Sequence, residues 1–280
     1  MARSDKQTHS AKAASKLTMQ PLVHLIEADT CPQAWLKAVG FLSSNHDAAY
    51  NLVLAVRRPE VLTPADFTIH DLVDAFLREY GRLSLATVAG TIFPANLYMH
   101  GGAEELYIYP QIYPRIPSQW GMYAIRMQRK STYRRGNGQA EINPLRIIVE
   151  KMKKQLAGGR MRAVYEVNLV EDTDYLELPI YDAGCDAVRT RRQPCLSHLS
   201  FKLLPRDRVM LTVLYRYHYY IEKALGNLLG LSQLLYFVAR ETGLGVGPLV
   251  CHSTYAVLDT QGGWGMGNVK QLVADCRRAK

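Results

Sequence analysis

Three side chains with complementary chemistry, those of Cys195, Arg216 and Asn227, lie close together in one stretch of the sequence. Alternating apolar residues predict two strands, at 196–203 and 209–215, joined by a polar turn. An apolar helical pattern follows Asn227. The sequence thus places a thiol, a guanidinium and a carboxamide at the edges of two strands and at a helix start. The thiol could attack a small anionic heterocycle, the guanidinium could bind its negative charge, and the carboxamide could form hydrogen bonds with its ring edge.

This stretch resembles the thymidylate synthase and pyrimidine hydroxymethylase superfamily, in which Pro-Cys precedes a strand, Arg ends the next strand and Asn starts a core helix. The flanking segments Glu241–Val250 and Ile142–Leu156 resemble the same family, and the resemblance covers about residues 118–259. It implies an α+β fold with a mixed β-sheet, packed helices and one sheet face buried in a homodimer. We expect one such domain over 19–280, after a polar, disordered tail at 1–18.

The resemblance makes Cys195 the catalytic nucleophile. Carbon 5 of a pyrimidine is too weak a nucleophile to take a one-carbon unit unaided, whereas a thiolate that adds to carbon 6 forms an enolate that can attack. This chemistry requires a lowered thiol pKa, usually from a neighbouring cation. Pairing of the two strands would bring Arg216 close to Cys195. The alternative is that Cys195 is a buried structural cysteine.

Five further side chains have binding roles by the same resemblance. Arg216 would hold the nucleotide phosphate bidentately, with His218 as a second donor; a solvent-exposed histidine at a strand end is the alternative for His218. Arg160 and Arg162 match arginines that the family takes from the partner subunit, unless they are ordinary surface residues. Asn227 would form hydrogen bonds with the edge of the pyrimidine ring; in this family Asn at this position suits uracil and Asp suits cytosine. The alternative is that Asn227 is a helix N-cap.

The one-carbon donor that the resemblance implies is 5,10-methylenetetrahydrofolate. Trp120 and Tyr123 belong to an aromatic segment that lies beside this cofactor in the family, so they could stack on it or simply anchor a loop. Tyr219 replaces an Asp that contacts the folate, and the family's closing C-terminal tail is missing from the sequence. Asp74, with Glu79 as its rival, is the nearest match to the catalytic acid. We therefore expect a pyrimidine monophosphate to bind more readily than a reduced folate.

Hydrophobic spacing and helix-end signals predict the remaining elements. Thr63-Pro-Ala-Asp66 starts one helix, and Gly81 ends its apolar pattern. Four prolines make 93–120 an expected surface loop or lid. The other predictions are helices at 35–42, 145–156, 222–240 and 269–278, strands at 48–56 and 162–170, and a buried helix or strand at 84–92.

The amino-acid composition limits the classes of protein to which this chain can belong. The chain has 280 residues, 48% of them hydrophobic, which is enough for a sizeable core. It has no apolar run of membrane-span length and no secretory leader, so we expect a cytoplasmic protein without a membrane partner. Its five cysteines are odd in number and lack CxxC spacing, which favours reduced thiols over disulfides or a metal site. The net charge of +9 suits phosphorylated small molecules, whereas no segment is basic enough for a nucleic-acid arm.

Two main hypotheses follow. The first is an enzyme similar to thymidylate synthase that methylates or hydroxymethylates carbon 5 of a uracil nucleotide monophosphate through a Cys195 adduct. The second is a dimer that keeps the fold and binds or senses pyrimidine nucleotides without turnover. A nucleic-acid binder, which only the positive charge supports, is a third hypothesis.

Overall fold

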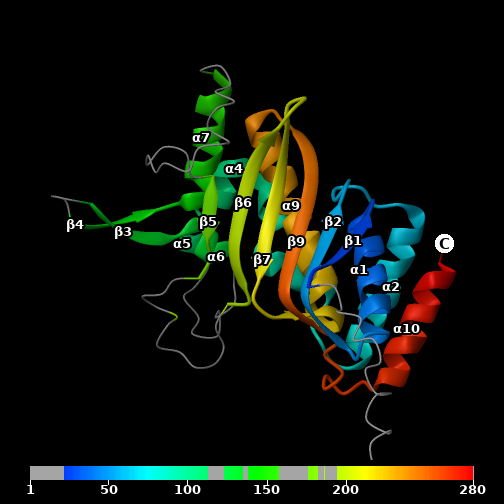
Figure 1. The fold of residues 1–280 in the computed structure, drawn as a ribbon. Helices are drawn as coiled ribbons and strands as arrows, with labels where there is room; N and C mark the ends of the chain where they lie inside the picture. Colours follow the sequence, from blue (N-terminus) through cyan, green and yellow to red (C-terminus); the bar gives the residue numbers. More distant parts are fainter. Residues whose placement is uncertain are drawn as a thin grey trace, which may run out of the picture.

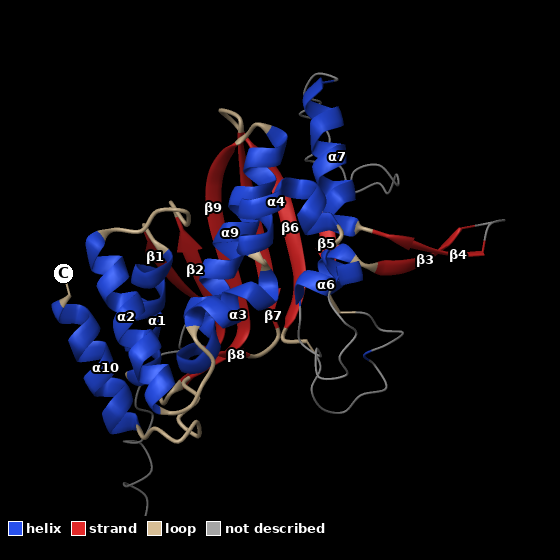
Figure 2. Ribbon diagram, turned by 180° about the vertical axis from the view of Figure 1, so that it is seen from behind, coloured by secondary structure: helices blue, strands red, loops and turns tan. Residues whose placement is uncertain are grey.

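The computed structural model describes residues 22–112, 123–134, 138–157, 176–181, 186 and 194–279. Most of the described strands form one mixed sheet, and helices cover one of its faces (Figures 1 and 2). Across the sheet the strands are β1 (His24–Ala28), β2 (Ala48–Val56), β9 (Gly245–Val257), β7 (Arg208–Tyr215), β6 (Leu196–Leu204) and β5 (Glu177–Pro179). Short β8 (His218–Tyr219) pairs with β9 beyond the end of β7, while β3 (Lys130–Arg134) and β4 (Gly138–Ile142) form a separate hairpin.

Two connections of this sheet are helical crossovers. Strands β1 and β2 pair in parallel and are joined by α1 (Cys31–Ser43), and β7 and β9 pair in parallel around α9 (Leu225–Thr242). Parallel neighbours need such a crossover, whereas the antiparallel pair β6–β7 needs only the tight turn that the sequence predicts. The expected mixed sheet with packed helices is therefore confirmed.

The helices stack in two layers behind the sheet. Helices α1 and α9 pack directly on the strands, α2 and α10 pack on α1, and α3 packs on α9 (Figure 2). The helices α6 (Tyr123–Gln128) and α7 (Pro144–Ala157) lie towards the β5 edge (Figures 1 and 2). The other described helices are α2 (Pro64–Glu79), α3 (Leu85–Ile92), α4 (Ala95–Tyr107), α5 (Tyr109–Ile112), a π-helix (Tyr220–Ala224) and α10 (Met266–Arg278).

The contact between α3 and α9 explains two glycines at the start of α9. A Cβ on Gly226 would lie 2.7 Å from the Val88 side chain, and one on Gly230 would lie 2.6 Å from the Ala89 carbonyl oxygen. Both glycines therefore let the two helices approach closely.

Asn227 lies inside the first turn of α9, which continues directly from the π-helix. The alternative of an N-cap at Asn227 is thus wrong.

Most of the predicted elements that lie in described residues are confirmed. The strand at 48–56 and the helix that starts at Pro64 have the predicted limits, and 84–92 proves to be a helix. The prediction of a loop over 93–120 is wrong in its described part, because α4 and α5 run to Ile112. The predicted tail at 1–18 and the strand at 162–170 lie outside the described residues.

The opposite face of the sheet carries no helix of the described chain (Figure 1). On β7 the buried residues alternate with Met210, Thr212 and Leu214, which are half-buried on this open face. His198 and His252 occupy equivalent half-buried positions on β6 and β9. Among the described helices, none combines the length and apolar character needed to cross a membrane.

Candidate functional site

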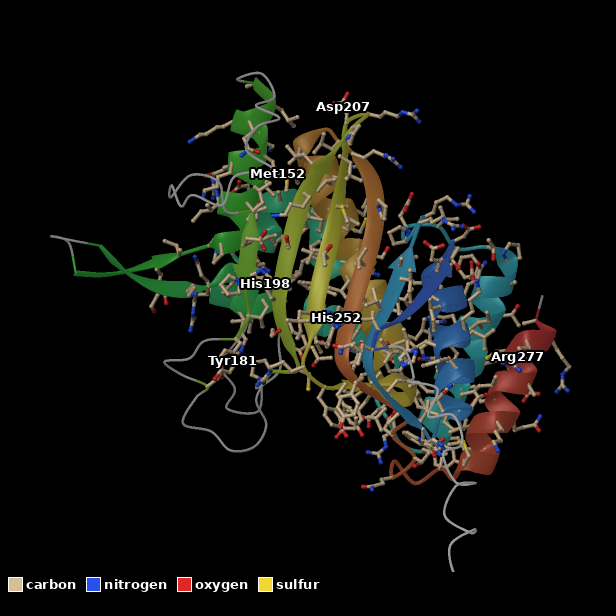
Figure 3. The ribbon with its side chains drawn as sticks, viewed as in Figure 1. Met152, Tyr181, His198, Asp207, His252 and Arg277 are labelled. Carbon is tan, nitrogen blue, oxygen red and sulfur yellow. The ribbon has the colours of Figure 1, made fainter. Side chains whose placement is uncertain are left out.

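The antiparallel pairing of β6 and β7 brings Cys195 and Arg216 together at one end of the sheet. The Arg216 backbone N–H donates to the Cys195 carbonyl oxygen (2.9 Å), and the Arg216 Nη2 donates to the Pro194 carbonyl oxygen (2.6 Å). The guanidinium also lies 4.9 Å from the centre of the Tyr181 ring, which Figure 3 labels at this end of the sheet. The predicted proximity of Cys195 and Arg216 is therefore confirmed.

The environment of Cys195 differs from that of the other described cysteines. Cys31, Cys251 and Cys276 are buried, and burial strongly raises the pKa of each thiol. Cys195 is only partly buried; burial raises the pKa of its thiol, and the positive charge of Arg216 acts in the opposite direction. Its thiol packs partly against the core, so the alternative of a structural cysteine stays open beside the role of nucleophile. The net pKa is still raised, so the thiol is neutral in the unliganded protein.

His218 faces the core instead of the solvent. Its Nδ1 lies 3.0 Å from Ser253 Oγ, and its Nε2 lies 3.1 Å from Asn227 Nδ2. Burial lowers the pKa of His218 to about 3, so the ring is neutral. Both expectations for His218 need correction: the ring is not exposed, and both of its nitrogens are already bonded inside the protein, so it cannot donate to a phosphate beside Arg216.

Asn227 and Tyr215 extend this buried polar group towards Cys195. Asn227 is 5% exposed, and its amide nitrogen donates to His218. The His218 ring stacks flat on Tyr215, with 4.0 Å between ring centres and 4° between planes. Tyr215 pairs with Leu196, the residue after Cys195, and Cys195 is among the groups that raise the pKa of the phenol. Tyr215 was not among the site residues predicted from the sequence, although an aromatic residue directly before Arg216 was a signal.

Tyr219 lies in a row of tyrosines that continues from the site along the sheet. It is 41% exposed and meets Tyr217 edge-on at 5.1 Å; Tyr217 meets Tyr255 at 5.0 Å, and Tyr255 meets Tyr50 at 5.0 Å. Cys195 is among the groups that raise the pKa of both Tyr217 and Tyr219. Tyr219 thus presents an exposed aromatic ring on the side of the site that Cys195 influences.

Tyr123 lies directly against the predicted nucleophile. Its hydroxyl accepts a hydrogen bond from the Leu196 backbone N–H (3.4 Å), and burial, together with the nearby Cys195, raises the pKa of the phenol to about 12. The hydroxyl is therefore protonated at neutral pH. Tyr123 therefore lies next to Cys195, and its stacking on a cofactor stays a prediction.

Asp74 has a structural use on α2. One carboxylate oxygen accepts from the Leu85 backbone N–H (2.7 Å) at the start of α3, and the other accepts from Arg78 (3.1 Å). No contact within the described chain brings Asp74 to Cys195, so its role as catalytic acid stays a prediction without structural support. Three predicted site residues, Trp120, Arg160 and Arg162, lie outside the described residues.

A second carboxylate, Asp259, positions the chain between the strand and the helix that carry the site. It accepts from the backbone N–H groups of Ile221 (2.8 Å) and Glu222 (3.0 Å) in the π-helix before α9. These bonds fix the direction in which α9 presents Asn227. Within the described part of the chain, His, Cys, Asp and Glu side chains form no group of three that could hold a metal ion.

Comparisons with known proteins identify no relative of this chain. No protein-family model matches the sequence, and no curated protein matches it. The resemblance to thymidylate synthases therefore rests on the residues described above.

Proposed function

We propose that this protein binds a pyrimidine nucleoside monophosphate and transfers a one-carbon unit to carbon 5 of its uracil ring, in the manner of thymidylate synthase. The observation that carries the proposal is the partly exposed Cys195 thiol beside the Arg216 guanidinium, at the end of two paired strands. A nucleophile next to an anion anchor suits a substrate whose phosphate is held while its ring is attacked. Transfer to carbon 5 then gives a methylated or hydroxymethylated base.

Arg216 has the geometry of an anchor for the phosphate. Its bond to the Pro194 carbonyl oxygen and its position over the Tyr181 ring fix the direction of the side chain. A planar guanidinium held in this way binds the oxygens of a phosphate in a defined orientation. Because the Cys195 carbonyl oxygen is bonded to the same residue, the phosphate and the reacting carbon would be held in a fixed relation.

The polarity of the Asn227 amide supports uracil over cytosine. Its Nδ2 donates to His218 Nε2, which requires that the proton of this neutral ring sits on Nδ1 and faces Ser253. The amide then has its carbonyl oxygen to accept from N3–H of uracil and its second N–H to donate to O4. Cytosine has the reverse pattern, which needs the reversed amide and, with it, the other tautomer of the His218 ring.

The one-carbon donor is proposed to be 5,10-methylenetetrahydrofolate. The exposed rings of Tyr217 and Tyr219 beside the thiol support stacking of a flat pterin, because aromatic pairs favour ring contacts at about 4.5–7 Å. Without a carboxylate at Tyr219 the pterin would lose a hydrogen bond. We therefore propose that the nucleotide binds first and more tightly than the folate.

The open sheet face is proposed to bury itself in a homodimer. Its central part mixes apolar and polar half-buried side chains: Val250 lies opposite Thr212, and Leu214 lies between His198 and His252. Met210 adds a further apolar side chain on β7. Strands with apolar residues on both faces are typical of sheets that are covered on both sides. A second copy would cover this face symmetrically. Light scattering at micromolar concentration tests the dimer, and a monomer would refute it.

Calorimetry with deoxyuridine monophosphate tests the proposed function. We expect the wild-type protein and Cys195→Ala to bind it, since phosphate and base contacts do not need the thiol. Arg216→Ala should weaken binding by roughly 2–5 kcal/mol, because a desolvated charge pair is lost. Deoxycytidine monophosphate, the matched ligand, should bind more weakly. A folded protein that binds no pyrimidine nucleotide would refute the proposal.

A nucleotide-binding protein without turnover is the second candidate. The raised pKa of the Cys195 thiol favours it, because a neutral thiol is a poor nucleophile. This candidate predicts the same binding but no exchange at carbon 5 of the base. The two candidates therefore separate in a single activity measurement.

A further inference from the structure

Tyr215 has a buried hydroxyl that no group in the described chain satisfies. The residue is 0% exposed, and its hydroxyl has no hydrogen-bond partner in that part of the structure. Buried hydroxyls almost always have a partner, because leaving one unpaired costs free energy. The comparison with Tyr220 is direct: this phenol is also 0% exposed, but its hydroxyl lies 3.2 Å from Ser253 Oγ.

The position of Tyr215 explains what its hydroxyl could meet. As the last residue of β7, it pairs with Leu196 on one side and with Ser253 on the other. Burial raises the pKa of Tyr215 well above its usual value, with further contributions from Tyr123 and Cys195. The hydroxyl is thus a protonated donor, and it belongs to the residue that pairs with Leu196, the direct neighbour of Cys195.

The ring of Tyr215 is also held in place before any ligand arrives. It stacks on His218, whose two nitrogens are bonded to Ser253 and Asn227. A donor that is fixed in advance loses no freedom when a ligand binds, so its hydrogen bond contributes in full. Tyr215 and Asn227 therefore form two ends of one rigid group.

We propose that Tyr215 is a binding residue for the pyrimidine base: its hydroxyl donates a hydrogen bond to a carbonyl oxygen of the uracil bound beside Cys195. This inference rests on the proposed function and adds a contact to the same site. In the unliganded protein the hydroxyl remains unpaired, which lowers stability slightly. In the complex the bond forms and strengthens binding.

The test compares two variants that each lose one buried hydroxyl, Tyr215→Phe and its matched control Tyr220→Phe. Thermal unfolding measures Tm without ligand, and calorimetry measures the Kd for deoxyuridine monophosphate. We expect Tyr215→Phe to keep or raise Tm and to weaken binding about tenfold, the usual effect of one hydrogen bond. We expect Tyr220→Phe to lower Tm, because Ser253 loses a partner, and to leave Kd within about twofold.

The outcomes separate this inference from the proposed function. Equal affinity in wild type and Tyr215→Phe overturns the inference alone, since the nucleotide still binds. A fall in Tm for Tyr215→Phe as large as that for Tyr220→Phe also overturns it, because the hydroxyl would then have a structural partner. If the wild-type protein binds no pyrimidine nucleotide, the proposed function fails and the inference fails with it.

Discussion

The buried His218 should make the stability of this protein depend on pH in a way that one substitution removes. His218 titrates with a pKa of about 3 in the folded protein, because burial disfavours the charged ring, against 6.5 in the unfolded chain. As the pH falls below 6.5, the unfolded chain takes up this proton before the folded protein does. The contribution of His218 is therefore complete above pH 6.5 and is lost progressively towards pH 3.

The size of the effect follows from the two pKa values. At pH 5 the unfolded state gains about 2 kcal/mol from protonation of this residue, while the folded state gains almost nothing. His218→Phe keeps a ring against Tyr215 but removes the titration. At pH 7 the variant should be less stable by roughly 1–3 kcal/mol, because Asn227 and Ser253 lose a buried partner. At pH 5 most of this difference should disappear.

Urea unfolding followed by circular dichroism at pH 7, 6 and 5 measures the effect, because every other titrating group is shared and cancels in the difference. Tyr220→Phe is the matched control: it perturbs the same network through Ser253 without removing an imidazole, so its offset should stay constant with pH. A difference between wild type and His218→Phe that is unchanged from pH 7 to pH 5 would show that His218 is not buried in its neutral form.

Three further predictions concern the framework around the site. Gly230→Ala should lower the free energy of unfolding by about 1–3 kcal/mol, because a Cβ would meet the backbone of α3 at 2.6 Å. Gly267→Ala, which has open space around its Cβ position, should leave the free energy of unfolding unchanged, and denaturant titration compares the two variants. Leu214→Asp on the open face should convert the dimer into monomers in light scattering, and a persistent dimer would place the interface elsewhere. Asp74→Ala should lower stability by about 1 kcal/mol through the lost bond to Leu85 while leaving the Kd for nucleotide unchanged; weakened binding would return Asp74 to the site.

Local signals predicted much of the fold. The strand at 48–56 is apolar except at Asn51, and Thr63 caps α2 in a reciprocal hydrogen-bonded arrangement with Asp66. The hairpin that carries Cys195 and Arg216 was equally local, but the register of its turn alone would set Arg216 opposite Leu196. A bulge between Leu196 and His198 shifts the pairing by one residue and brings Cys195 opposite Arg216. By contrast, 93–112 was expected to be a loop because of its prolines, but Pro94 stands at the start of α4 and does not interrupt it.

The orientation of His218 could not be predicted from alternation. Tyr215 is buried, so strict alternation would place Arg216 outside, Tyr217 inside and His218 outside. The chain breaks between β7 and β8, and the extra residue reverses the pattern: His218 and Tyr220 turn inwards, while Tyr217 and Tyr219 turn outwards. A break of this kind depends on pairing with β9, which joins the chain far later in the sequence.

The most direct measurement of the central claim is the release of tritium from carbon 5 of labelled deoxyuridine monophosphate without any folate. Addition of the Cys195 thiolate at carbon 6 by itself activates carbon 5 for exchange with water. We predict that the wild-type protein releases tritium, and that Cys195→Ala binds the nucleotide but releases none. Release that persists in Cys195→Ala, or a wild-type protein that binds the nucleotide and releases none, would contradict the proposed covalent mechanism.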